Sequence, residues 1–206
     1  MITRKTLVTL TMVIAALGAA GSATVGWHLH TMKASPVKFS HAAWKVKFDA
    51  PSDLPRGADV VVLGTAVSSR PGRIAFSQKG EDSVPFEEVT FQVVRGMKGI
   101  RSGESVVVER AGGIDYEGHN VFLDADGGLF EIGSTYLLFL KKQEEGNFYY
   151  QVNDQGRYKV ETGRLVAVSP EDPVAGFFHG KSLTEGMGLI DEFLGRRPVN
   201  PPGQQN

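Results

Sequence analysis

The feature that most constrains the fold of this chain is a series of short apolar runs between Ala58 and Val168, separated by turn residues and not by helical segments. Residues 86–94 show the pattern best, because apolar and polar side chains alternate there with the two-residue period of a half-buried strand. Residues 135–142 are apolar at nearly every position, which is typical of a strand buried on both faces. The seven runs are DVVVLGTAV, FEEVTFQVV, SVVVER, TYLLFLKK, FYYQV, RYKV and RLVAV.

This succession of strands predicts a mainly β fold, with a single antiparallel OB-like barrel over residues 56–170 that is closed or nearly closed. Two long polar connections are expected between the strands, at 68–85 and at 111–133. Connections longer than about 12 to 15 residues inside a compact domain are uncommon and often functional. The connection 111–133 is therefore the first place to look for a site.

One helix is expected after the barrel, in the region 171–197. Ser182 and Glu185 have the spacing of a capping box at its start, and Gly195 marks its end. Gly186 lowers the stability of this helix by about 1 kcal/mol relative to Ala, so the helix is expected to depend on packing against the barrel. The apolar stripe that would make this contact is Leu183, Met187, Ile190 and Leu194.

Residues 1–27 have the layout of an export segment. Basic Arg4 and Lys5 precede the uncharged run 6–27, and small residues suit a cleavage after Ala23. Left uncut, the run would form a helix about 33 Å long, enough to cross a hydrocarbon core. A cleaved signal peptide and a retained membrane anchor both remain open. Either one predicts an extracytoplasmic protein, secreted or anchored to the membrane by one N-terminal helix.

Two further segments complete the predicted organisation. Residues 28–55 are expected to connect the export segment to the barrel, as a solvated tether or, alternatively, with their basic side chains on an anionic membrane surface. Residues 198–206, PVNPPGQQN, are expected to be a disordered tail because they contain almost no apolar side chains to bury.

Charge is distributed unevenly along the 206 residues. Six basic residues precede Asp49, the first acidic residue, which leaves 16 of the 22 Lys and Arg residues against all 23 Asp and Glu residues. Beyond that point the chain carries about −7, so binding to nucleic acid is disfavoured. No cysteine is present, which excludes disulfides, thiolate metal sites, iron–sulfur clusters and cysteine nucleophiles.

Five segments, GADVVVLGTAV, EVTFQVVRGMKG, SGESVVVERAGG, FEIGSTYLLFLKK and YYQVNDQGRYKV, resemble those of a group of exported bacterial proteins of uncharacterised function. The fold of that group is similar to the netrin-like, tissue-inhibitor-of-metalloproteinase-like OB-type barrel. The resemblance covers about Ala58 to Val168 and implies the fold. Those inhibitors chelate the protease zinc through an amino-terminal cysteine, which this chain lacks, so the resemblance does not imply inhibition by that route.

The candidate binding residues lie in the connection 111–133. Two carboxylates and an imidazole alternate there, so an extended backbone would place them on one face, as ligands for zinc or a hard cation. A solvated acidic loop is the more ordinary interpretation, since the spacing in DADGGLFE is not that of a calcium loop. No metal is therefore assigned. The candidate binding residues are Asp115, Glu117, His119, Asp124 and Asp126.

No catalytic signature is present, because the sequence lacks a GxSxG elbow, a P-loop, HExxH and the Rossmann glycines. We therefore expect a non-enzymatic binding module without a cofactor, whose partner is a protein or a component of the cell envelope. Two alternatives stay open. One is a metal-assisted hydrolase that uses Asp115, Glu117 and His119, and the other is a structural envelope protein with no specific ligand.

Overall fold

The structure is a computed structural model of the chain. It describes residues 37–40, 47–76, 83–114, 120–123, 128–143 and 147–196. The expected export segment and the expected tail from residue 198 lie outside these ranges, so both stay predictions. Within the described ranges, no helix combines the length and the apolar character that crossing a membrane requires.

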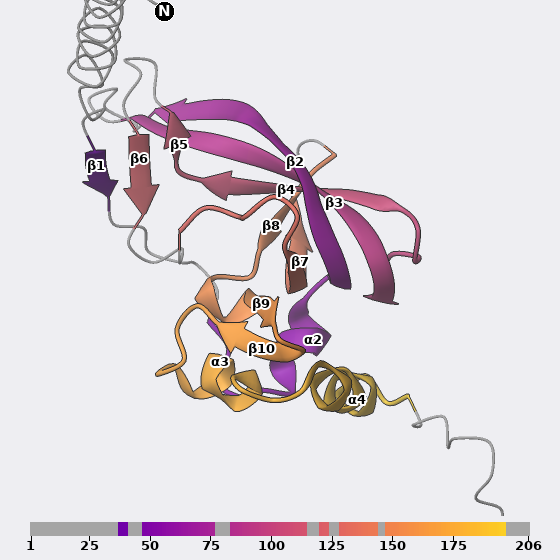
Figure 1. The fold of residues 1–206 in the computed structure, drawn as a ribbon. Helices are drawn as coiled ribbons and strands as arrows, with labels where there is room; N and C mark the ends of the chain where they lie inside the picture. The colour runs from indigo at the N-terminus through magenta and orange to yellow at the C-terminus, as the bar shows by residue number, and fades with distance from the viewer. Residues whose placement is uncertain are drawn as a thin grey trace, which may run out of the picture. The chain divides into compact units, whose positions relative to one another are not determined.

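Seven strands form the main sheet, in the order β10-β9-β7-β2-β3-β4-β8 (Figure 1). Neighbours are antiparallel except β4 and β8, which are parallel. β8 also pairs with β7, so the pairings lead from β2 through β3, β4, β8 and β7 back to β2. The predicted mainly β class is confirmed. The strands are β2 (Val60–Phe76), β3 (Ser83–Lys98), β4 (Ser105–Ala111), β7 (Thr135–Lys142), β8 (Tyr149–Gln151), β9 (Arg157–Glu161) and β10 (Arg164–Ala167).

The polar stretch 68–85 is mostly a long hairpin, so the prediction of a loop there is wrong. β2 runs on to Phe76, and β3 begins at Ser83. Beyond the core the β2 side chains are mostly exposed, and the ribbon is held by cross-strand pairing. Arg70 Nε, for example, donates to Glu88 Oε2 over 2.8 Å. No strand signal marks this stretch in the sequence, because neither face of the ribbon has a continuous apolar row.

A second, three-stranded sheet has the order β1-β6-β5, with β1 parallel to β6 and β5 antiparallel to it. The predicted connector 28–55 therefore contains a strand, and the predicted loop 111–133 contains two. These strands have at most four residues each, and the paired Val37 and Asn120 are 83 positions apart, so no local pattern indicates them. Their bounds are β1 (Val37–Ser40), β5 (Gly113–Ile114) and β6 (Asn120–Leu123).

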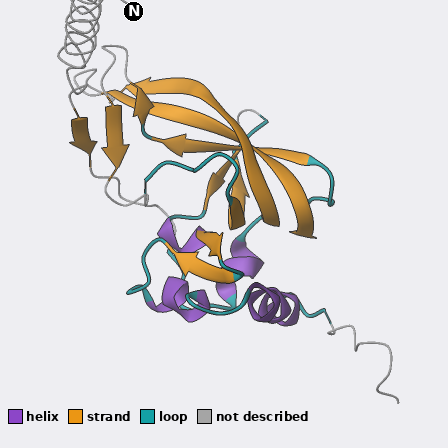
Figure 2. Ribbon diagram, in the orientation of Figure 1, coloured by secondary structure: helices purple, strands orange, loops and turns teal. Residues whose placement is uncertain are grey.

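Two helices follow the strands where the sequence predicted one, which corrects that expectation. The additional helix is α3, whose cap Asp172 accepts from the N–H groups of Val174 at 2.9 Å and Ala175 at 3.1 Å. It has only six residues, too few to show an apolar period. Figure 2 shows the helices gathered around β9 and β10. They are α2 (Asp53–Gly57), the 3-10 helix η2 (Asp154–Gly156), α3 (Pro173–Phe178) and α4 (Leu183–Phe193).

The predicted C-terminal helix is α4, and its signals are confirmed. Ser182 Oγ accepts from the Glu185 N–H at 3.2 Å, and Gly195 has φ +71° after the last turn. The predicted apolar stripe packs against the core. A Cβ at Gly186 would collide with Leu165 Cδ1, so the glycine that weakens the helix is the one that lets it approach β10.

Two buried clusters lie on opposite faces of β2 and β7. Successive residues of β7 alternate between them: Leu137 and Phe139 belong to one cluster, and Leu138 and Leu140 to the other. All four side chains are fully buried. The expectation that residues 135–142 form a central strand buried on both faces is confirmed.

Candidate functional site

The five candidate residues of the sequence, Asp115, Glu117, His119, Asp124 and Asp126, lie outside the described residues. The binding and metal hypotheses that rest on them therefore stay predictions. In the part of the chain that the structure describes, no three His, Asp or Glu side chains lie close enough together to hold a metal ion.

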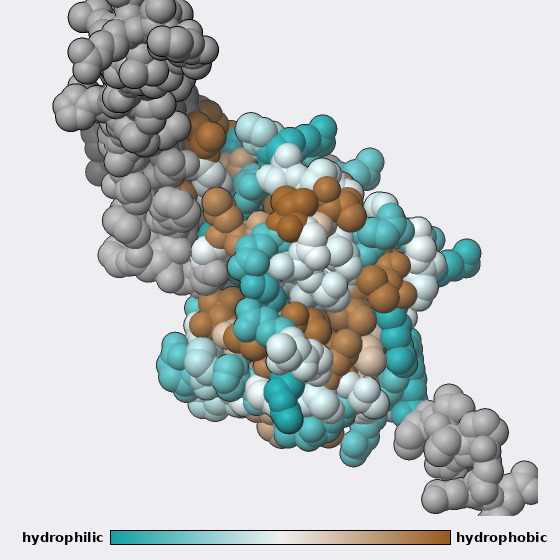
Figure 3. Space-filling model, in the orientation of Figure 1, coloured by the Kyte–Doolittle hydropathy of each residue, from teal (hydrophilic) through white to brown (hydrophobic). Residues whose placement is uncertain are grey.

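The exposed apolar side chains come from several different elements. On the face shown in Figure 3, hydrophobic residues form separate patches among hydrophilic ones. A large contiguous apolar patch would mark a protein interface, and the face in Figure 3 shows no such patch among the described residues. The large apolar residues that are more than a third exposed are Val67, Phe76, Val94, Ile114, Leu129, Ile132 and Phe177.

A pocket of about 210 Å³ opens where β4 and β8 separate. The two strands pair at Val108 and Tyr149, and the residues that follow in each strand are among those that line the pocket. Its volume is below the ~300–1,000 Å³ of sites that enclose drug-sized ligands, so it suits a group the size of one side chain. The lining residues are Arg73, Phe86, Glu109, Arg110, Ala111, Gln143, Tyr150 and Gln151.

Gln151 is the unusual residue of this pocket. It ends β8 directly opposite Leu140, a fully buried residue of β7, and is itself only 2% exposed. Neither its Oε1 nor its Nε2 has a hydrogen-bond partner among the described residues. Leaving a buried amide unpaired costs about 1–3 kcal/mol for each group, so nearly all such groups in folded proteins find a partner.

An ion pair forms another wall of the pocket. Glu109 is 5% exposed and accepts from Arg73 twice, with Nε to Oε1 at 2.8 Å and Nη2 to Oε2 at 3.1 Å. The Arg73 guanidinium also lies 4.5 Å from the centre of the Phe86 ring. Gly72 permits this close approach of the two strands, because a Cβ there would lie 3.1 Å from the Phe86 carbonyl oxygen. The bidentate pair neutralises the buried carboxylate and fixes the wall.

A second polar hollow surrounds Gln155, and its groups serve the fold. Gln155 Oε1 accepts from the Phe48 N–H at 2.9 Å, while its Nε2 donates to the Phe48 carbonyl oxygen and to Asp172 Oδ1, both at 3.0 Å. Asn153 holds φ +40°, and its Oδ1 accepts from the Gln155 N–H at 2.7 Å. Lys47 lies 3.0 Å from Asp172 Oδ2. This network ties the segment before α2 to the start of α3.

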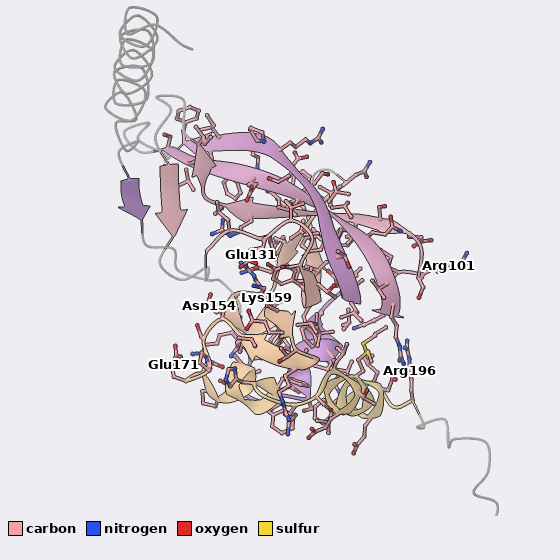
Figure 4. The ribbon with its side chains drawn as sticks, in the orientation of Figure 1. Arg101, Glu131, Asp154, Lys159, Glu171 and Arg196 are labelled. Carbon is pink, nitrogen blue, oxygen red and sulfur yellow. The ribbon has the colours of Figure 1, made fainter. Side chains whose placement is uncertain are left out.

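The charged groups near β9 also have structural roles. Arg157, which is 4% exposed, donates to the carbonyl oxygens of Gly128 at 2.8 Å and Leu129 at 3.0 Å, and so anchors the segment before β7. Figure 4 shows Glu131 beside Lys159, whose Nζ lies 2.8 Å from the carboxylate. The hydrogen bond between them lowers the pKa of Glu131 and raises the pKa of Lys159. Both are solvated, as surface ion pairs usually are.

The pocket residues were missed by the sequence analysis, although two signals point toward them. Glu109 and Arg110 are charged residues at the end of an apolar strand, and the structure buries both. Gln151 is a polar residue in an aromatic strand. Neither signal identifies a pocket, because Arg73 and Phe86 come from other strands.

Comparison with known proteins adds no relative to this description. No protein-family model and no curated protein matches the chain. The function is therefore argued from the site alone.

Proposed function

We propose that this chain is a non-enzymatic extracytoplasmic binding module with an OB-type barrel, and that the pocket between β4 and β8 is its ligand site. The observation that carries the proposal is the buried amide of Gln151, which lines the pocket without a partner among the described residues. Among the described residues, the lining contains no Ser, Thr, Cys, Lys or His, and the carboxylate found there, that of Glu109, is held by Arg73. Binding is therefore better supported than catalysis.

The pairing of five strands supports the OB-type interpretation. β2 pairs with both β3 and β7, β4 is parallel to β8, and β8 returns to β7. OB barrels bind on the face of their second and third strands and at the loops that join the first two and the last two strands. The pocket takes Phe86 from the second of these five strands, Glu109 from the third, and Gln143 from the connection between the last two.

The cellular setting of the proposal comes from the sequence. The uncharged run 6–27 favours export, and the resemblance to exported netrin-like proteins points the same way. The partner we propose is a protein or a component of the cell envelope, and the connection 111–133 is a second contact surface. No nucleic acid and no cofactor form part of the proposal, and the membrane is reached only through the N-terminal segment.

Binding at the pocket is tested by titrating the ¹⁵N-labelled full-length chain with a set of small polar and aromatic fragments. We expect chemical-shift changes at Phe86, Glu109 and Gln151, and their loss in Gln151→Met. Fragments that bind only elsewhere, or a complete set that shifts none of these residues, would contradict the pocket as a ligand site.

The partner is sought by affinity capture from the native host with three tagged baits. The baits are the unaltered chain, Gln151→Met, and a variant with Asp115, Glu117 and His119 all replaced by Ala. A partner lost with the loop variant supports the connection 111–133 as a contact surface, and a partner lost with Gln151→Met supports the pocket. Equal capture by all three baits contradicts both surfaces.

A further inference from the structure

We propose that three arginine side chains around the end of α4 form a docking site for a short acidic segment of a partner protein. The arginines are Arg56, Arg95 and Arg196, called here the arginine cluster. The inference rests on the proposed function only in taking the partner to be a protein, because the cluster shares no residue with the pocket between β4 and β8. It adds the chemistry of the partner and the place where it docks.

The cluster is assembled from three separate parts of the chain. Arg95 of β3 places its Nη2 3.2 Å from Asp191 Oδ2, and Arg196, which follows α4, places its Nη1 3.7 Å from Asp191 Oδ1. Arg56 of α2 donates from Nε to the Phe193 carbonyl oxygen over 3.1 Å. Figure 4 shows Arg196 where the chain leaves α4. The three guanidinium groups therefore surround the last turn of one helix.

The carboxylates nearby do not neutralise the cluster. Asp191 is shared by two of its members, while Arg56 hydrogen-bonds only to a backbone carbonyl oxygen among the described residues. Lys98 adds a further cation, because its Nζ donates to the Arg56 carbonyl oxygen at 2.8 Å. Glu192, the next residue on α4, is directed about 100° further around the helix than Asp191. The last turn of α4 therefore carries a local excess of positive charge.

Most N–H groups of the cluster are available to a ligand. A guanidinium offers five N–H donors, and among the described residues Arg56 uses only Nε and Arg95 only Nη2 in hydrogen bonds. The side chains of Arg95 and Arg196 are 50% and 52% exposed, and Arg56 is exposed as well. Guanidinium groups bind carboxylates through paired N–H···O hydrogen bonds. The cluster therefore suits the side chains of Asp and Glu.

Charge complementarity indicates how long the acidic segment is. Beyond Asp49 the chain carries about −7, so an acidic partner is repelled by most of the surface and attracted at the cluster. An extended polyanion would also meet the acidic surface around the cluster. A segment of a few residues, ending within the reach of the three guanidinium groups, avoids that repulsion.

The test compares three probes on the unaltered ¹⁵N-labelled full-length chain. They are acetylated hexaglutamate, acetylated hexaglutamine and inorganic phosphate, and the Nε–H signals of the cluster are followed during each titration. We expect hexaglutamate to shift all three signals and hexaglutamine to shift none. The hexaglutamate affinity should fall at least about threefold between about 0.01 M and 0.15 M salt, because these exposed charges are screened.

Replacing all three arginines locates the site. The variant Arg56→Gln, Arg95→Gln, Arg196→Gln should bind hexaglutamate at least about tenfold more weakly, since each exposed pairing contributes a few-fold. Arg164→Gln is the matched control. Arg164 is exposed and also donates to a backbone carbonyl oxygen, that of Gly180 at 2.7 Å, but it is bridged to Ser182 at the opposite end of α4. It should leave the affinity unchanged.

One further variant separates docking from a purely structural role, in which arginines only stabilise the end of a helix. Asp191→Asn removes the carboxylate that competes for Arg95 and Arg196. Docking predicts that hexaglutamate then binds about threefold or more tightly. A structural role predicts lower stability with no gain in affinity, and this result would overturn the inference.

The remaining outcomes also decide the question. The acidic-segment inference is wrong if hexaglutamate shifts none of the three arginine signals, or if hexaglutamine binds equally well. Phosphate that binds the cluster as tightly as hexaglutamate would show a site for phosphate groups instead. Each of these results leaves the pocket between β4 and β8 untouched, because the fragment titration tests that site separately.

Discussion

Gln151 and Gln155 are four residues apart in the sequence and equally buried, at 2% exposure each, yet their surroundings are opposite. The Gln155 amide makes two hydrogen bonds to the backbone of Phe48 and one to Asp172, and it accepts a longer one from Asn153 Nδ2 at 3.4 Å. The Gln151 amide makes none with the described residues, and Gln151 lines a pocket. Burial of a polar side chain therefore does not by itself indicate its role. A satisfied amide holds the fold together, whereas an unsatisfied one beside a pocket indicates a ligand.

The largest expected change in the free energy of unfolding comes from replacing Gln155, the glutamine whose amide is hydrogen-bonded. Gln155→Met removes the three short hydrogen bonds to Phe48 and Asp172, besides the longer one from Asn153, and takes these partners from the Phe48 N–H and carbonyl. At about 1 kcal/mol for each bond, the free energy of unfolding should fall by about 3 kcal/mol. Denaturant unfolding at neutral pH measures it. A loss below about 1 kcal/mol would show that water replaces this network and that the contrast with Gln151 is false.

A second effect concerns the wall of the pocket. Arg73→Met leaves the buried Glu109 carboxylate without its bidentate partner. Because the Arg73 side chain is half exposed, water offsets part of the loss, and we expect about 2 kcal/mol of destabilisation. Adding Glu109→Gln should restore part of the stability, since the buried side chain at position 109 then carries no charge. A double variant as unstable as the single one in thermal unfolding would contradict this account.

The pH dependence of stability tests the Gln155 network through Asp172, the carboxylate that accepts from Gln155 Nε2. Burial alone would raise the pKa of Asp172, but hydrogen bonds from Gln155, the Ala175 N–H and Lys47 outweigh it, so the pKa lies below its usual value. A carboxyl with a depressed folded pKa contributes stability that is present above its unfolded pKa and is lost as pH falls through the folded pKa.

Unfolding measured below about pH 4 should therefore show a steep loss of stability that is shallower in Asp172→Asn. Some slope should remain, because the pKa of Asp59 is also lowered: burial opposes the shift, and hydrogen bonds from Lys141 and the Lys142 N–H outweigh it. Identical slopes in the two proteins would mean that Asp172 has the same pKa folded and unfolded.

The smallest expected change in the free energy of unfolding comes from replacing Gln151, the glutamine whose amide is not hydrogen-bonded to the described residues. Gln151→Met should change the free energy of unfolding by less than about 1 kcal/mol, or raise it slightly, because an apolar side chain replaces an unpaired buried amide of similar length. The same denaturant unfolding as for Gln155→Met gives a direct comparison. A loss as large as that of Gln155→Met would show that Gln151 supports the fold, and the pocket would lose its main support.

Local patterns in the sequence identified the elements that keep one regular burial pattern, or one set of capping residues, within a short stretch of the chain. The apolar run 135–142 indicated a strand buried on both faces, and the structure places its side chains alternately in two cores. Ser182 and Gly195 indicated the ends of α4, because capping depends on residues within one turn. The ribbon over 68–85 was missed, since a solvated hairpin has no apolar period.

The pocket could be identified only from the tertiary structure. Arg73, Phe86, Glu109 and Gln151 come from four strands, and no spacing in the sequence relates them. The difference between Gln151 and Gln155 is likewise invisible in the segment that contains both, because the partners of Gln155 lie as far away as Phe48. The sequence by itself indicated the mainly β class and the last helix, through short-range periodicity and capping. Only the tertiary structure decided which buried polar groups are paired, because pairing depends on contacts between residues distant in the chain.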